Sequence, residues 1–267
     1  GKDVATLAVS ALGPDLVALD ADFKPLRPAI LYGIDTRATD EITWLDDHFG
    51  SMEMAKQSGM LLTSSAIGPK ILWLKNHEPE TFKKTRYLCS GSSYLVLRLT
   101  GEYILDRHSA SHYNPLFDIR TLEWSETFAA PLVGDYQMPR LTWAQEMAGK
   151  LTAQAANEMG LQPGTPVTAG TVDSIAEAIS IGAVHPGDLA VTFGTTTYFV
   201  QVMDISIFNE TMWHSAYFRP GLYLMEGGTS ATGGMTRWFR DNFAKKEMEI
   251  EQAVSEEHTS ELQSQYV

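Results

Sequence analysis

Cysteine and long apolar runs are scarce in this sequence. Cys89 is the single cysteine among 267 residues, so no intramolecular disulfide can form, and the first residues lack the charged-then-apolar pattern of a secretory leader. Charged residues such as Lys70 and Asp173 interrupt the most apolar stretches before they reach the length of a membrane span. We therefore expect a soluble protein in a reducing compartment, the cytoplasm.

Basic residues are also few. The sequence has 20 Lys and Arg against 33 Asp and Glu, which gives a net charge of −13. Because that charge repels nucleic acid and anionic membrane surfaces, we expect neither as a partner. A bound phosphate would need donors supplied locally.

Several motifs of well-known enzyme classes are missing. The sequence has no Walker A loop, no GxGxxG and no GxSxG nucleophile elbow, which excludes P-loop, Rossmann and α/β-hydrolase proteins. His108 and His112 stand four residues apart but lack the adjoining carboxylate motif of zinc proteases. We therefore expect no structural metal.

The pattern of apolar residues predicts both strands and helices. Strands are predicted at residues 4–9, 15–20, 29–32, 166–170, 189–193, 198–203, 216–219 and 222–226, and helices at 37–49, 68–77, 173–184 and about 230–247. Their mixture predicts an α/β fold. A domain boundary is expected near residue 185, because the turn-rich segment His185–Asp188 separates the helical part from the strand-rich part.

Asp173 is the best candidate for acid–base chemistry. It follows a predicted strand that ends in Ala169–Gly170 and precedes a helix, and open α/β sheets bind ligands beyond such strand ends. The alternative is an ordinary N-cap aspartate that satisfies free amides of the first helical turn. Both roles remain open at this point.

Two further turns could bind a ligand. Gly194, Thr195 and Thr196 lie between two apolar strands, where a tight turn can aim donors at phosphate oxygens, although a plain hairpin has the same pattern. Asp35 and Arg37 follow a predicted strand and could bind a polyhydroxylated ligand, although they could also cap the next helix.

Four blocks of residues follow one another along the chain. They are Pro25–Tyr32 with Asp35–Arg37; Pro69–Glu80; Leu99–Tyr103 with Asp106, Ser109–Ser111, Asp118 and Trp124; and Ala169–Asp173 to Gly182 with Pro186–Gly187 and Gly194–Thr196. Together they resemble the FGGY family of carbohydrate kinases over residues 1 to about 250. The resemblance implies a duplicated ribonuclease-H-like domain, the fold that is shared with actin and hexokinase.

The resemblance also implies a chemistry. The whole protein would use ATP and Mg²⁺ to phosphorylate a hydroxyl of a small sugar or polyol bound between two domains. Asp173 matches the family's general base and would act on Mg²⁺ only indirectly, while Gly194, Thr195 and Thr196 match a phosphate loop. Gly13, Pro14, Asp35, Arg37 and Ser174 would line the sugar site. A homodimer is left open for the full-length protein.

The sequence departs from the family at several places. Gly13–Pro14 stands where xylulokinases have a Met-His pair that holds the ketose, and Ser174 replaces their asparagine, so D-xylulose is not the expected substrate. The family's N-terminal Asp-x-Gly-Thr turn and its glycine-rich adenosine loop are missing. We therefore expect a fragment with little kinase activity, measurable as little ADP release with any sugar.

The expected domains follow from this comparison. Residues 1–184 would be the sugar-binding domain without its first strands, 185–254 the truncated start of the nucleotide domain, and 255–267 a polar tail that resembles a translated sequencing adapter. The competing hypothesis is a noncatalytic sugar-binding or actin-like scaffold module with the same fold, which would not need Asp173 as a base.

Overall fold

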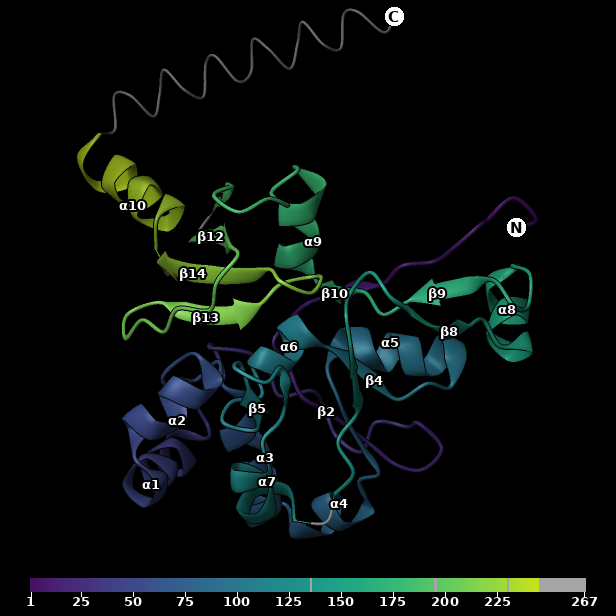
Figure 1. Ribbon diagram of the computed structural model, residues 1–267. Coiled ribbons are helices and arrows are strands. Elements are labelled where there is room, and N and C mark those ends of the chain that lie inside the picture. The colour runs from purple at the N-terminus through teal and green to yellow at the C-terminus, as the bar shows by residue number, and fades with distance from the viewer. Residues whose placement is uncertain (135, 195, 230, 245–267) are drawn as a thin grey trace, which may run out of the picture. The chain divides into compact units, whose positions relative to one another are not determined.

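The computed structural model describes residues 1–134, 136–194, 196–229 and 231–244 (Figure 1). Contacts divide the chain into two units, one formed by Gly1–Leu189 and Gln201–Glu226 and the other by Ala190–Val200 and the residues from Gly227 onward. The tail expected at 255–267 lies outside the described residues. The domain boundary expected near residue 185 stays a prediction.

Helices outweigh strands in the first unit, as the apolar periodicity predicts. The helices of the described residues are α1 (Thr39–Phe49), α2 (Ser51–Ser58), α3 (Ile67–His77), α4 (Pro79–Lys84), α5 (Gly91–Thr100), α6 (Arg107–Ser111), α7 (Glu126–Val133), α8 (Ala153–Met159), α9 (Asp173–Ser180) and α10 (Gly233–Phe243). The predictions of helices at 37–49 and 68–77 are therefore confirmed. None of these helices is long and apolar enough to cross a membrane.

The strands are short. They are β1 (Ser10–Ala11), β2 (Val17–Leu19), β3 (Tyr87–Cys89), β4 (Ile104–Asp106), β5 (Phe117–Asp118), β6 (Glu123–Trp124), β7 (Arg140–Thr142), β8 (Met147–Lys150), β9 (Pro166–Thr168), β10 (Thr171–Val172), β11 (Leu189–Phe193), β12 (Thr197–Met203), β13 (Trp213–Ala216) and β14 (Tyr223–Thr229). Two-stranded pairs are β1-β10, β2-β3, β4-β7, β5-β6 and β8-β9, and a four-stranded sheet has the order β11-β12-β14-β13.

The core of the first unit forms where α1 and α3 turn their apolar faces inward. Leu45 of α1 and Ile67, Ile71 and Leu74 of α3 are fully buried in one cluster with Phe117. Burying side chains of this size stabilises a fold by roughly 1.5–3 kcal/mol each. This cluster fixes α3, which carries one of the charged side chains of the site described below.

The first predicted strand, residues 4–9, is only partly formed. Leu7 pairs with β9 through its N–H to the Pro166 carbonyl and its carbonyl to the Thr168 N–H, both at 2.9 Å. This parallel pairing is interrupted at Gly170, whose φ of +68° is a conformation that glycine adopts without penalty. Pairing resumes in β1 and β10, so the prediction of one continuous strand is wrong in its extent.

A second strand prediction fails at residues 216–219. The strand β13 ends at Ala216, and the chain then turns through Pro220–Gly221, where the Tyr217 N–H donates to the Leu222 carbonyl at 3.0 Å. Pro and Gly favour turns because of their backbone geometry. The turn, rather than the preceding apolar residues, decides where this strand ends.

The pair formed by β2 and β3 buries the cysteine. Cys89 lies opposite Val17 in an antiparallel register and is fully buried. Burial raises the pKa of its thiol to about 12, while a hydrogen bond with Ser93 opposes the shift. The thiol therefore stays protonated in the folded chain.

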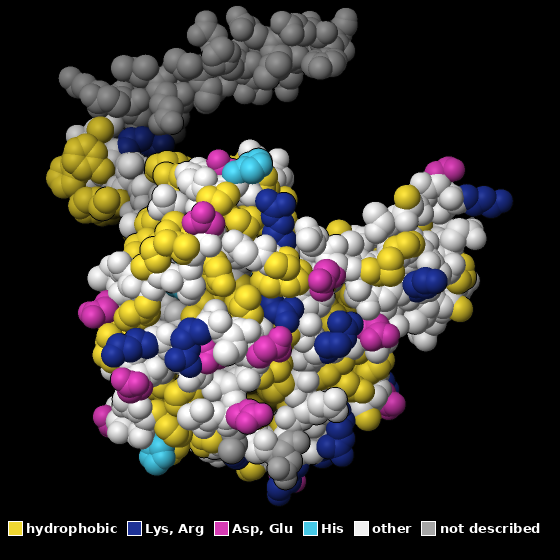
Figure 2. Space-filling model, in the orientation of Figure 1, with side chains coloured by type: hydrophobic (Ala, Val, Ile, Leu, Met, Phe, Trp, Pro, Cys, Tyr) yellow, Lys and Arg dark blue, Asp and Glu magenta, His cyan; other side chains and the backbone are white. Residues whose placement is uncertain are grey.

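In the second unit, α10 exposes its apolar side chains. Met235, Trp238, Phe239 and Phe243 are 56–67% exposed, and Figure 2 shows hydrophobic side chains gathered over this helix. The start of the helix is tied to the loop after β11 by a hydrogen bond from the Gly233 N–H to the Gly194 carbonyl at 3.1 Å. No residue of α10 is buried by the described part of the chain.

Candidate active site

Two parallel strands bring the predicted base close to the start of the chain. In β1 and β10, Ser10 pairs with Thr171 and Ala11 with Val172. Because the carboxyl ends of parallel strands lie at the same edge, the residues that follow β1 meet those that follow β10. Asp173 is therefore the neighbour of the segment Gly13–Asp15.

Asp173 is the first residue of α9 and is half-buried. Its Oδ1 accepts a hydrogen bond from the Ser174 N–H at 2.8 Å. The N-cap position belongs to Val172, which makes no side-chain cap, so the alternative of an N-cap aspartate is off by one position, although Asp173 does accept an amide hydrogen bond of the first helical turn. Among the described residues Oδ2 accepts no hydrogen bond, and this oxygen can take a proton from a ligand.

Gly13 and Pro14 form the wall next to Asp173. A Cβ atom on Gly13 would overlap Cγ1 of Val172, so only glycine lets the end of β1 approach β10 this closely. Neither Gly13 nor Pro14 has a polar side-chain atom. This part of the predicted sugar site therefore offers shape but no side-chain hydrogen bonds.

Asp15 joins the site, although sequence reasoning did not single it out. Its carboxylate is buried and accepts a hydrogen bond from the Gly91 N–H, at the start of α5, at 2.9 Å. Burial raises the pKa of Asp15 to about 6, and the nearby charge of Asp173 adds to the shift, whereas the Gly91 N–H and Lys70 oppose it.

Lys70 is a second charged residue that sequence reasoning missed. Its side chain is fully buried on α3, and Nζ donates a hydrogen bond to the Leu31 carbonyl. Burial lowers the pKa of Lys70 to about 8, while the charges of Asp35 and Asp15 oppose the shift. The ammonium group therefore links the two acidic residues electrostatically.

Asp35 and Arg37 form an ion pair at this site. Arg37 Nε lies 2.8 Å from Asp35 Oδ1 and 3.1 Å from Oδ2, and its guanidinium lies 4.7 Å from the centre of the Trp73 ring. The hydrogen bond from Arg37 lowers the pKa of Asp35. The alternative that these residues cap α1 is wrong, because α1 begins at Thr39 with Ala38 at its N-cap and no side-chain cap.

Packing and charge interactions thus link eight residues of the first unit, some expected from the sequence and some not. They are Gly13, Pro14, Asp15, Asp35, Arg37, Lys70 and Asp173, with Ser174 beside the last. The clue to Lys70 is a lone charge inside an apolar helical run. Asp15 gives no comparable clue, because its partner Gly91 is 76 positions away.

The predicted phosphate loop lies in the second unit. Gly194 and Thr196 are exposed, and the Gly194 N–H donates to the Thr196 carbonyl at 2.9 Å, which closes a tight turn. A Cβ on Gly194 would meet only the Thr196 carbonyl, at 3.7 Å. Thr195 lies outside the described residues.

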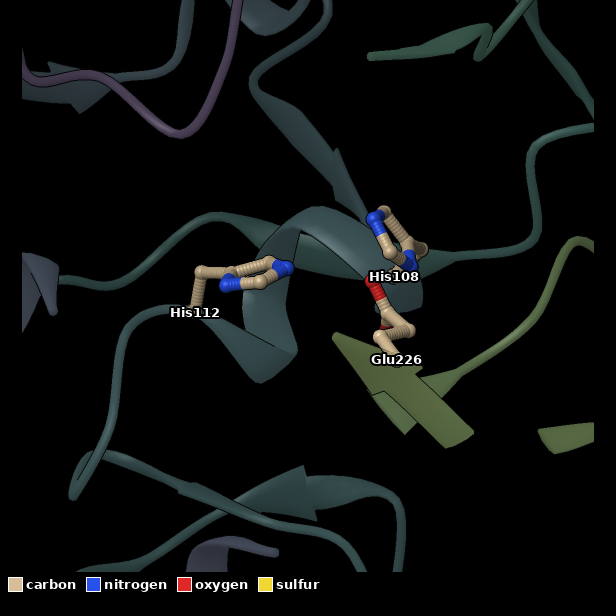
Figure 3. A group of neighbouring side chains, drawn as sticks. All are labelled: His108, His112 and Glu226. Atoms are coloured by element: carbon tan, nitrogen blue, oxygen red, sulfur yellow. The ribbon is translucent and has the colours of Figure 1, made fainter. Parts of the chain in front are cut away.

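A second polar cluster lies inside the first unit. His108 and His112 of the α6 region lie beside Glu226 of β14, and all three are buried (Figure 3). Burial lowers the pKa of His112 to about 4, with the neighbouring His108 adding to the shift and Glu226 opposing it. The pKa of His108 is also lowered by burial, against the charge of Asp106. Both rings are therefore neutral near pH 7.

Comparisons with known proteins agree with this architecture. The N-terminal domain of the FGGY family of carbohydrate kinases matches residues 1–180. Xylulose kinase of Escherichia coli (strain K12) is 32% identical over 205 residues, which cover 76% of this chain and 41% of that protein. Gluconokinase of Bacillus subtilis (strain 168) is 26% identical over 251 residues, which cover 93% of this chain and 48% of that protein.

A solved structure is similar over the same range. Xylulose kinase from Rhodospirillum rubrum superposes with a TM-score of 0.87 at 27% identity, over 93% of this chain and 51% of that one. The chain therefore spans about half the length of the relatives it matches.

Proposed function

Because the chain belongs to the FGGY family of carbohydrate kinases, we propose that the whole protein transfers the γ-phosphoryl group of ATP to a hydroxyl of a small sugar or polyol. One observation carries the proposal. A half-buried carboxylate, Asp173, begins α9 at the shared edge of β1 and β10, within electrostatic range of Asp15. The family match to residues 1–180 supports a sugar-binding domain that ends near residue 184.

Asp173 acts as the general base in this proposal. As the sugar oxygen bonds to the γ-phosphorus, the bond from that phosphorus to the departing ADP would break and the hydroxyl proton would move to Asp173 Oδ2, while the hydrogen bond from the Ser174 N–H holds Oδ1. A positioned base contributes on the order of 10²–10⁴ to a rate. Phosphoryl transfer otherwise depends on alignment and on charge neutralisation.

The residues present fit ATP and Mg²⁺ in part. When bound, ATP supplies the phosphoryl group and Mg²⁺ neutralises its charge. The exposed glycine and threonine at the turn Gly194–Thr196 leave room for phosphate oxygens. Carboxylate oxygens are the ligands that Mg²⁺ prefers, and Asp173 would hold the ion through a water molecule.

The sugar would lie between Asp173 and the ion pair of Asp35 and Arg37. These two side chains are partly exposed, at 17% and 33%, and can exchange hydrogen bonds with hydroxyl groups. Ser174 adds a hydroxyl next to the base. Asp15 and Lys70 are buried, so their role is to set the charge of the site rather than to contact sugar.

The proposed substrate is a polyol or ketose other than D-xylulose. The wall formed by Gly13 and Pro14 offers no polar side chain, and a site without a hydrogen-bonding partner discriminates weakly for the corresponding hydroxyl. A panel of pentoses, hexoses, polyols and gluconate, assayed with the whole protein by ADP release, tests the proposal. Absence of ADP release with every sugar would contradict the activity, and a highest kcat/KM for D-xylulose would contradict the substrate inference.

Replacing Asp35 by asparagine should weaken sugar binding by roughly 10- to 150-fold, because a hydrogen bond to a charged group contributes about 1.5–3 kcal/mol. The loss should show in the sugar Kd, measured by calorimetry without ATP, more than in kcat. The matched control is Asp22→Asn, an exposed aspartate outside the site. An unchanged Kd in Asp35→Asn would remove the ion pair from the sugar site.

A further inference from the structure

Three possible metal ligands converge inside the first unit, and none of them is a residue of the sugar site described above. His108 and His112 come from one turn of helix, and Glu226 comes from β14, more than a hundred residues later. One ligand atom from each lies within 4.8 Å of the others, and all three side chains are buried. Figure 3 shows the two rings and the carboxylate turned toward one another.

Neighbouring groups orient these ligands. The Nδ1 atom of His108 lies 3.1 Å from the Ala216 carbonyl and 3.2 Å from Ser215 Oγ. The Ser215 hydroxyl also donates a hydrogen bond to Glu226 Oε1. A histidine that donates one ring N–H to a carbonyl keeps its other nitrogen unprotonated, which is the usual arrangement around metal-binding histidines.

The donor set indicates which ion fits. Two imidazoles and one carboxylate suit borderline transition metals, whereas Mg²⁺ prefers oxygen ligands. A set of two histidines and one glutamate binds Zn²⁺ in several proteins, with water in the fourth position. We propose that His108, His112 and Glu226 bind one Zn²⁺ ion.

The ion would join two distant segments of the first unit. It would connect the α6 region to β14, beside the hydrogen bond that Ser111 Oγ already accepts from the Ala216 N–H of β13 at 3.1 Å. Because such a site is absent in the unfolded chain, metal binding adds directly to the stability of the fold. The role is structural, and it is independent of the proposed kinase activity.

Metal content and spectroscopy test the proposal on the full 267-residue chain. The chain is stripped with a chelator and then loaded with Zn²⁺ or Co²⁺. We expect about one ion per chain by elemental analysis. Bound Co²⁺ should give the intense visible absorption of a four-coordinate site. His112→Asn and Glu226→Gln should lose at least ninety per cent of both signals, whereas His48→Asn, which changes an exposed histidine, should keep them.

Thermal unfolding gives a second measurement. Zn²⁺ at about a hundred times its Kd should raise the Tm of the wild-type chain by roughly 5–10 °C, whereas Mg²⁺ should not. Circular dichroism shows whether each variant folds, and His112→Gln replaces any variant that does not. The proposal would be overturned if the wild-type chain bound neither Zn²⁺ nor Co²⁺. It would also be overturned if His48→Asn lost as much metal as His112→Asn, and the cluster would then be a buried hydrogen-bond network only.

Discussion

Replacing Asp173 by asparagine should lower the kcat of the whole protein by about 10²–10⁴-fold and leave its Tm nearly unchanged. Asparagine has the same size, and its side-chain oxygen can still accept the hydrogen bond from the Ser174 N–H that Oδ1 accepts in the wild type. The start of α9 should therefore keep its geometry. What disappears is the oxygen that takes the proton of the attacking hydroxyl.

Three measurements separate catalysis from structure in this variant. They are kcat by ADP release, the sugar Kd without ATP, and the Tm. Glu177→Gln is the matched control, because Glu177 is an exposed acidic residue on the same helix. A kcat close to that of the wild type in folded Asp173→Asn would leave Asp173 a structural residue, and a wild-type protein that binds sugar without turnover would favour the noncatalytic module.

Asp15→Asn should stabilise the chain at pH 7 by about 2–3 kcal/mol, because the pKa of the buried carboxyl is raised from 3.8 to about 6. Below the pKa of the unfolded state, Asp15 is protonated in both the folded and the unfolded chain, so its burial does not lower the free energy of unfolding. Between about pH 4 and pH 6 the unfolded chain releases the Asp15 proton while the folded chain keeps it, and above pH 6 the folded chain must bury the charge. The wild type therefore loses stability relative to the variant between about pH 4 and pH 6, and the difference stays constant at higher pH.

Unfolding experiments from pH 4 to pH 7.5 check this expectation. The Tm of Asp15→Asn should exceed that of the wild type by about 5–10 °C at pH 7, and the difference should shrink toward zero near pH 4. The exposed Asp22→Asn is the control and should show no such trend. A difference that stays constant with pH would mean that Asp15 is not held as a buried charge.

The sequence predicts the fold class well. The mixed α/β fold expected from the alternation of strands and helices is confirmed by the similarity to the Rhodospirillum rubrum kinase. Helices α1 and α3 could be predicted because their apolar residues recur with helical spacing and end near Phe49 and His77. Strands were harder, since breaks such as Gly170 depend on partners far along the chain.

Site residues could be predicted from the sequence only where a charged side chain directly follows a predicted strand. Asp35, Arg37 and Asp173 stand in such places, whereas Asp15 becomes notable only through the Gly91 N–H and the charges around it. The histidine and glutamate cluster shows the same difficulty. His108 and His112 gave no metal signal, because the carboxylate beside them is supplied by Glu226 from a distant strand.

Chemical labelling of Cys89 can report local unfolding of the chain. It is the single cysteine, fully buried opposite Val17 in the β2-β3 pair, with a pKa near 12. Thiol reagents react with the exposed thiolate, so alkylation can proceed only when this pair opens. The labelling rate, read by mass spectrometry, therefore gives the opening frequency of one defined strand pair without any engineered probe.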